Sequence, residues 1–167
     1  MTFTIEPLTR RHDRSQFSCG VEALDRYIRQ QASADARRRV ARVLVARVEE
    51  GSEVAGFYTL SAGSMERDSL PPEVAKRLPR YPVPVALIGR LAVDRRWGGQ
   101  GLGSSLVADA FRRVVRASEV MAVYAVVVDA KDERAAGFYE RLGFIRLLDA
   151  GRRLFFPTSA VERWIAD

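Results

Sequence analysis

The sequence predicts an α+β fold with a mixed α/β sheet, in which most strands are antiparallel, one central pair is parallel, and helices cover both faces. The candidate antiparallel strands come first along the chain, with one helix between them, and a strand–helix–strand unit over 85–129 follows, which favours a parallel pair. The length of 167 residues suits one compact core. We therefore expect a single domain over residues 1–167.

Apolar spacing and turn residues define the elements of the first half. Val21, Leu24 and Ile28 recur at helical spacing, so we expect a helix over 21–31. The segment 33–39 has few large apolar side chains, and it forms either an exposed continuation of this helix or a loop. The polar segment 50–53 is typical of a hairpin turn. Strands are expected over 2–7, 43–49 and 54–62.

Proline and glycine residues mark the ends of several elements expected in the second half. Two prolines open a short helix expected over 71–78, and three more hold 79–84 as an extended link. A helix over 133–142 stops at Gly143, the usual place for a left-handed cap. Ser159 and Glu162 form a capping box, which predicts a terminal helix from Ser159. The remaining elements are a helix over 102–117 and strands over 85–94, 122–129, 144–148 and 153–156, the last two joined by a turn at 149–152.

Charge is the most informative feature of the composition. Lys76 and Lys131 are the two lysines among 27 basic residues, which leaves 25 arginines, against 21 acidic residues. The formal charge of +6 suits a nucleotide, a nucleic acid or an acidic protein as partner, or simply a soluble basic surface. Apolar runs are too short to span a bilayer and no signal peptide is visible, so we expect a cytoplasmic protein.

The single cysteine and the single histidine argue against disulfide, metal and triad chemistry. Cys19 cannot form an internal disulfide and has no histidine beside it in the sequence. His12 lies in a polar segment and is expected on the surface. We therefore expect no metal site and no histidine-based triad.

A glycine-rich turn between the strand over 85–94 and the helix over 102–117 carries the strongest chemical signal. Its glycines leave backbone N–H groups uncovered at a helix start, where the helix dipole attracts anions, and Arg95 and Arg96 add positive charge. The turn therefore predicts a phosphate-binding site, although a tight connection without a ligand would also need such glycines.

Two commoner nucleotide motifs do not fit this turn. A P-loop needs a lysine before serine or threonine, and the turn has no lysine. A dinucleotide fold needs a third glycine where Ser104 stands, and it places the turn after the first strand rather than past mid-chain.

Two segments resemble the signatures of the GNAT superfamily of N-acetyltransferases. Arg96-x-x-Gly99-x-Gly101 is similar to its pyrophosphate motif. The resemblance implies the GNAT acyl-CoA N-acyltransferase fold and acetyl-CoA as the cosubstrate. Many members have asparagine where Asp132 stands in the second segment, which reads Asp132-x-x-Ala135-x-x-Phe138-Tyr139-x-x-x-Gly143-Phe144.

The resemblance also implies roles for individual residues. In this superfamily the central strand splays away from the next strand, and backbone groups of 91–93 would meet the pantetheine arm and the thioester in the resulting V-shaped gap. The turn would bind the pyrophosphate, and Tyr139 would protonate the departing CoA thiolate. A tyrosine hydroxyl remains protonated at pH 7 and can donate to a thiolate, although Tyr139 could instead be a core aromatic beside Phe138. The implied cofactor-binding residues are Leu91, Ala92, Val93, Arg96, Gly98, Gly99, Gln100, Gly101, Leu102, Gly103, Ser104, Asp132, Ala135 and Phe138.

The N-terminal third resembles one branch of the superfamily, the GNAT toxins of type II toxin–antitoxin systems, in its segments Phe17-Ser18-Cys19-Gly20 and Leu24-Asp25-Arg26-Tyr27. This resemblance implies acetylation of the α-amino group of aminoacyl-tRNA, which blocks translation. It also implies a ribbon-helix-helix antitoxin and a homodimer. Two alternatives stay open: an acetyltransferase acting on a protein N-terminus, a lysine or a small amine, and a non-catalytic module that binds CoA or a partner.

Arginines gather in the N-terminal third and before the strand over 85–94. They are candidates for contacts with tRNA phosphates, but they would equally suit a solvated helix face or an antitoxin-docking surface. The candidate residues are Arg29, Arg37, Arg38, Arg39, Arg77, Arg80 and Arg90.

Overall fold

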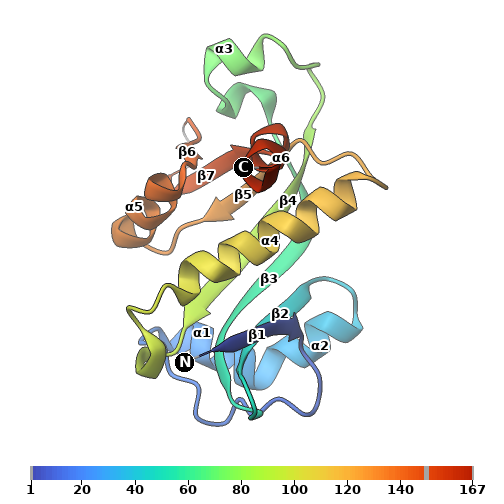
Figure 1. The fold of residues 1–167 in the computed structure, drawn as a ribbon. Coiled ribbons are helices and arrows are strands. Elements are labelled where there is room, and N and C mark those ends of the chain that lie inside the picture. The colour runs from blue at the N-terminus through green and yellow to red at the C-terminus, as the bar shows by residue number, and fades with distance from the viewer. Residues whose placement is uncertain (1, 149–150, 167) are drawn as a thin grey trace. The chain divides into compact units, whose positions relative to one another are not determined.

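A computed structural model describes residues 2–148 and 151–166 (Figure 1). The chain divides into two compact units: an N-terminal unit, which runs to Ser61 and includes Gly89–Ala110, and a C-terminal unit, formed by Ala62–Ile88 and the chain from Phe111 onward. The elements are β1 (Phe3–Pro7), α1 (Glu22–Arg26), η1 (Tyr27–Gln31), α2 (Ala32–Arg37), β2 (Arg42–Val48), β3 (Val54–Met65), η2 (Arg67–Ser69), α3 (Pro72–Ala75), β4 (Val83–Val93), η3 (Arg95–Trp97), α4 (Leu102–Ser118), β5 (Ala125–Asp129), α5 (Glu133–Leu142), β6 (Ile145–Arg146), β7 (Arg153–Pro157) and α6 (Thr158–Ala166).

The strands form one sheet in the order β1-β2-β3-β4-β5-β7-β6. Among the described strands, β4 and β5 form the parallel pair, with Val85 opposite Ala125, and the pairs β1–β2, β2–β3, β5–β7 and β6–β7 are antiparallel. The expected mixed sheet with a central parallel pair is therefore confirmed. Within the described residues, no helix combines the length and the apolar character that a membrane crossing requires.

The first helical segment of the N-terminal unit is longer than its apolar spacing suggests. It begins at Glu22 and continues as helix to Arg37, with a π-helical stretch over Tyr27–Gln31. Arg14 compensates the irregular stretch, because its Nη1 donates to the carbonyl of Ile28 at 2.9 Å. The segment 33–39 is thus mostly helix, and it ends where Arg39 adopts a left-handed φ of 61°.

Each unit has its own apolar core. In the N-terminal unit, Phe57 packs against Phe17 and Tyr27 at ring-centroid distances of 5.5 and 6.1 Å. In the C-terminal unit, Phe111 lies 4.8 Å from Phe156. These contacts fix β3 and the second half of α4 in their respective units.

Several predicted boundaries are wrong, and local hydrogen bonding explains them. The strand expected over 122–129 begins at Ala125, opposite Val85, and Pro84 just before Val85 has no N–H to donate to a longer ladder. The helix expected over 71–78 shortens to Pro72–Ala75, since Pro79 disfavours helical geometry just before it.

The boundaries near the C-terminus also differ. The strand expected over 144–148 shrinks to Ile145–Arg146, and within the turn expected at 149–152 residues 149 and 150 lie outside the described residues. The terminal helix begins at Thr158, so Ser159 lies inside it and is not its cap. Earlier in the chain, β3 extends beyond the expected residue 62 to Met65.

Candidate active site

The glycine-rich turn lies in the N-terminal unit, between β4 and α4. Gly99 and Gly101 have left-handed φ values of +73° and +78°, which side chains rarely adopt. A Cβ built on either residue would meet nothing within 4 Å. Backbone conformation therefore requires these glycines, and the space above them is open to a ligand.

The first residue of α4 packs against β3. Leu102 is buried, and Gly56 on β3 permits its approach, because a Cβ at Gly56 would lie 3.3 Å from the Leu102 side chain and 3.1 Å from the carbonyl of Ala92. The first N–H groups of a helix have no partner within the helix. Gly103 and Ser104 thus contribute uncovered N–H donors at the positive end of a 17-residue helix.

Arg96 braces the turn with its side chain. Its Nε and Nη2 each lie 3.0 Å from a carboxylate oxygen of Asp94, and its Nη1 lies 2.8 Å from Glu53. The guanidinium also stacks 4.5 Å above the ring of Trp97. The hydrogen bonds from Arg96 to Asp94 and Glu53 raise the pKa of its guanidinium further. Arg96 therefore contributes mainly to the shape of the turn.

Asp94 joins the turn to the N-terminal segment. Its buried carboxylate accepts hydrogen bonds from the N–H of Ser18 at 3.0 Å and the N–H of Arg96 at 2.9 Å, and the N–H of Arg95 donates to the carbonyl of Ser18. Burial alone would raise the pKa of Asp94, but the hydrogen bonds from Arg96 and Ser18 outweigh it and lower the pKa. This support by Asp94, Glu53 and Ser18 was missed in the sequence, where the signal was an aspartate directly after a buried strand.

The last residues of β4 lead into the turn. At Gly89 a Cβ would lie 3.1 Å from the Thr59 hydroxyl, and the N–H of Arg90 donates to that hydroxyl at 3.1 Å. Ala92 is buried, whereas Leu91 and Val93 are half-buried. These residues lie in the same unit as the turn.

The second signature lies on α5 in the C-terminal unit. Asp132 caps this helix, because its Oδ1 accepts the N–H of Ala135 at 2.8 Å. An asparagine could form the same cap, so the capping role accounts for either residue. Gly143 closes the helix with a φ of +109°. The segment therefore builds a well-defined helix that carries Phe138 and Tyr139.

Tyr139 combines a buried ring with a hydroxyl that has no hydrogen-bond partner among the described residues. Its ring packs at 5.0 Å against Phe138 and at 5.4 Å against Phe144. Burial raises the pKa of Tyr139, so its hydroxyl is neutral at pH 7. Among the described residues, the Tyr139 hydroxyl is not one of the side-chain atoms that are both unpaired and fully buried, as Thr158 Oγ1 is. Tyr139 is thus equipped to donate a proton.

Six of the seven candidate tRNA-binding arginines fall into two groups. Arg29, Arg37, Arg38 and Arg39 are exposed and lie on or just after the first helix of the N-terminal unit. The last three surround the helix C-terminus, where positive charge is favourable whether or not a ligand binds. Arg77 and Arg80 are exposed in the C-terminal unit.

Arg90 occupies a different environment. Its guanidinium stacks 3.7 Å above the ring of Tyr27, whose hydroxyl donates to Asp35 at 2.9 Å. Burial and the bond to Asp35 raise the pKa of Tyr27 to about 12. The structure therefore holds Arg90 in one position within the N-terminal unit.

The expected surface position of His12 is wrong. His12 is 6% exposed, its Nδ1 accepts the N–H of Thr9 at 2.9 Å, and its Nε2 lies 2.6 Å from Glu6. These contacts identify a neutral ring that donates from Nε2 to Glu6. Cys19 is half-buried. Within the described residues, no cluster of three potential metal ligands occurs.

Comparisons with known proteins agree with these features. Residues 7–144 match the acetyltransferase (GNAT) family. The chain is 39% identical over 132 residues to the tRNA-acetylating toxin of Mycobacterium tuberculosis (strain ATCC 25618 / H37Rv), covering 79% of this chain and 78% of the relative. Among solved structures, AtaT complexed with acetyl-methionyl-tRNAfMet has a TM-score of 0.92 and 35% identity, covering 98% of this chain and 99% of that one. A tyrosine-to-phenylalanine mutant of AtaT, bound to acetyl-CoA and the C-terminus of the antitoxin AtaR, has a TM-score of 0.86 and 32% identity, covering 99% of both chains. The chain therefore belongs to the acetyltransferase (GNAT) family.

Proposed function

We propose that this chain is a toxin that transfers the acetyl group of acetyl-CoA to the α-amino group of the amino acid on charged tRNA. The observation that carries the proposal is the open turn with two left-handed glycines at the start of α4, in a chain similar to AtaT and to a tRNA-acetylating toxin. Residues 1–167 would act as a single N-acetyltransferase domain.

The turn supports binding of acetyl-CoA through its pyrophosphate. Uncovered N–H groups from Gly99 to Ser104 offer donors, and the dipole of α4 favours negative charge at this end. Gly98, Gln100 and Leu102 would shape the cradle. Backbone groups of 91–93 would hold the pantetheine arm, as the family resemblance implies. A related AtaT structure contains acetyl-CoA.

Tyr139 is proposed as the general acid. The neutral α-amine attacks the thioester carbon, and the tetrahedral intermediate collapses by breaking the C–S bond. The attacking nitrogen carries a positive charge once the N–C bond has formed, and it loses a proton to solvent water. The sulfur leaves as a thiolate and takes the proton of the Tyr139 hydroxyl, and the resulting phenolate regains a proton from water. Because burial keeps the phenol protonated, the donor is in the required form at neutral pH. Phe138, Ala135 and the Asp132 cap hold the helix that presents Tyr139.

The arginines of the N-terminal unit would contact the tRNA backbone. Arg29, the run 37–39 and Arg90 carry positive charge on one unit of a chain whose formal charge is +6. Among the described residues, the arginines at 37–39 form no ion pair with a carboxylate, so they remain available to phosphates. Arg77 and Arg80 are further candidates.

The partner proposed for this toxin is a ribbon-helix-helix antitoxin, which would dock through its C-terminal segment. A related AtaT is bound to the C-terminus of AtaR. We further propose a homodimer and a cytoplasmic location, where charged tRNA is present.

The test is incubation of the purified chain with labelled acetyl-CoA and tRNAs charged with each amino acid in turn. We expect label on the α-amino group of at least one aminoacyl-tRNA and none on uncharged tRNA. Labelling of proteins or small amines with no labelling of any charged tRNA would refute the proposed substrate. Absence of transfer to every acceptor, with acetyl-CoA binding intact, would refute the enzymatic function.

A further inference from the structure

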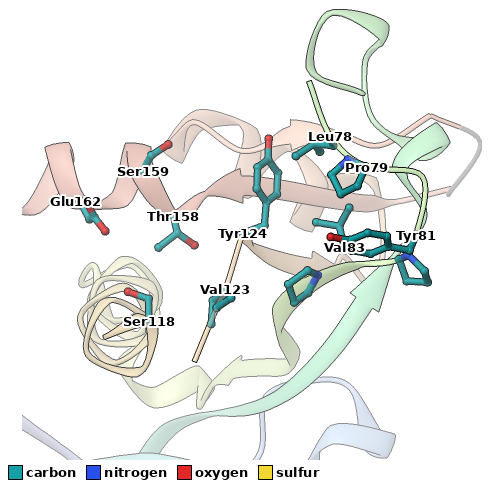
Figure 2. Close-up of a pocket in the computed structure, with 13 residues that line it drawn as sticks. Leu78, Pro79, Tyr81, Val83, Ser118, Val123, Tyr124, Thr158, Ser159 and Glu162 are labelled. Atoms are coloured by element: carbon teal, nitrogen blue, oxygen red, sulfur yellow. The ribbon is translucent and has the colours of Figure 1, made fainter. Parts of the chain in front are cut away.

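A cavity lies within the C-terminal unit, and none of its lining residues is used in the proposed reaction. It has a volume of about 690 Å³, in the range of ligand-binding sites. Figure 2 shows its walls: Pro79, Tyr81 and Val83 on one side, Thr158, Ser159 and Glu162 of α6 on the other, and Tyr124 between them. All of its lining residues belong to this unit.

The cavity is preformed and largely apolar. Pro79, Pro82 and Pro84 fix the backbone of one wall, and the N–H of Tyr124 donates to the carbonyl of Pro84 at 2.9 Å, which ties that wall to β5. Arg67 pins the same loop, since its Nη1 donates to the carbonyl of Leu78. A rigid wall lowers the entropy lost when a partner binds.

Large exposed apolar side chains lie in the cavity wall and directly before one of its lining residues. Tyr81 is 68% exposed and lines it, while Val120 and Met121 are 86% and 62% exposed and directly precede the lining residue Ala122. Apolar surface that extends beyond a cavity is typical of a protein-binding site rather than of a small-molecule site. Prolines cannot donate to an added strand, so a partner would dock by inserting side chains.

An unsatisfied polar atom also lies in the wall. Thr158 is 5% exposed, and its Oγ1 has no hydrogen-bond partner among the described residues. Buried hydroxyl groups are normally paired, so this atom is a polar defect in the wall. The chain seals it from solvent, so it does not by itself identify an occupant.

The charged residues around the cavity favour an acidic peptide over a second copy of the chain or a phosphate backbone. Arg77 and Arg80 flank the lining residues Leu78 and Pro79, and within the described chain neither pairs with a carboxylate. The charge of Arg77 reaches the cavity, because it opposes the rise that burial causes in the pKa of Tyr124. A second copy docking by two-fold symmetry would bring the same arginines together, which is unfavourable. Glu162 on the opposite wall and the apolar lining disfavour a phosphate backbone.

We propose that this cavity docks a peptide segment of the antitoxin that inserts apolar side chains between Tyr81 and Tyr124 and places acidic side chains over Arg77 and Arg80. The proposal rests on the proposed function, because it takes the partner to be an antitoxin. It assigns that partner a surface of the C-terminal unit that includes none of the residues of the glycine-rich turn.

The test uses fluorescence anisotropy with a fluorescein-labelled synthetic peptide, the C-terminal segment of the antitoxin encoded beside this chain. Tyr81→Ser removes an exposed wall residue and Ala122→Trp fills the cavity from an exposed position. Ile145→Ser is the matched control, because Ile145 is an exposed apolar residue of the same unit that does not line the cavity. We expect at least a tenfold weaker Kd for both cavity variants, a change below twofold for the control, and weaker binding at higher salt.

The outcomes separate this proposal from the proposed function. All three variants should acetylate charged tRNA as the unmodified chain does, which also shows that they fold. Unchanged peptide affinity in both cavity variants, or no binding of the peptide to the unmodified chain, overturns the docking proposal and leaves the enzymatic function standing. A cavity variant that instead loses dimerisation, or needs more tRNA for half-maximal rate, assigns the cavity to a second copy or to tRNA and also overturns it.

Discussion

Replacing Asp94 with asparagine should loosen the glycine-rich turn and weaken acetyl-CoA binding. Asparagine has nearly the same shape, but it loses the negative charge and turns an N–H₂ group toward donors that the carboxylate now accepts. Those donors are the backbone N–H groups of Ser18 and Arg96 and the Arg96 guanidinium. The substitution therefore tests whether this buried carboxylate holds the turn in place.

The hydrogen bonds that Asp94 accepts determine how much stability Asp94→Asn should lose. A hydrogen bond to a charged acceptor contributes about 1.5–3 kcal/mol, and Asp94 accepts two from backbone N–H groups. The Arg96 side chain is 43% exposed and keeps Glu53 as a second partner, so its ion pair with Asp94 adds at most about 1 kcal/mol. Because asparagine retains one neutral acceptor, we expect Asp94→Asn to lower the free energy of unfolding by about 3 kcal/mol.

The effect should depend on pH in a defined direction. The pKa of Asp94 is lower in the folded chain than in the unfolded chain. The stabilisation by its carboxylate is therefore fully present above the unfolded-state pKa and is lost as pH falls through the lower folded-state pKa. The stability difference between the unmodified chain and Asp94→Asn should accordingly shrink at acid pH.

Urea unfolding and steady-state kinetics check these expectations. We expect KM for acetyl-CoA to rise about tenfold, which corresponds to a loss of about 1.4 kcal/mol of binding free energy, with little change in kcat at saturation. Asp68→Asn is the control, since Asp68 is exposed and its nearest cation, Arg67, is 3.7 Å away. A destabilised Asp94→Asn variant whose KM for acetyl-CoA is unchanged would refute the link between this carboxylate and cofactor binding.

Three further predictions concern the proposed site. Gly99→Ala should cost about 1–2 kcal/mol of stability and raise KM for acetyl-CoA, because Gly99 has a φ of +73°. Gly98→Ala, at a φ of −66°, should leave the stability nearly unchanged, and equal losses of stability in urea unfolding would contradict this. Tyr139→Phe should lower kcat about 10²- to 10⁴-fold while acetyl-CoA binding, measured by calorimetry, is unchanged, and full activity would show that another group is the acid. Arg38→Glu should raise KM for charged tRNA and reduce its salt dependence, whereas the same change at the exposed Arg10 should not, and matching effects would place tRNA elsewhere.

Local patterns in the sequence determined the elements that carry the candidate site. The alternation of strand and helix, the glycines of the turn and Gly143 at the end of α5 are set by short-range backbone preferences, which act the same way in any fold. The mixed sheet with one parallel pair followed from the order of these elements. The ends of β5, β6 and α3 did not, because a strand ends where its neighbour stops offering hydrogen bonds and a helix ends where the next proline allows.

The tertiary structure alone decided what the polar side chains do. The sequence shows Arg96 only as a positive charge beside the glycine-rich turn, and the structure shows that its guanidinium donates to Asp94 and Glu53. His12 looked exposed, yet it is buried against Glu6. In both cases the hydrogen-bonding partner could not be recognised from the local sequence pattern. The free energy of burying a polar group depends on whether such a partner is present. The sequence predicted where the chain would bind phosphate, and the fold decided which of its charged groups are held by partners within the chain.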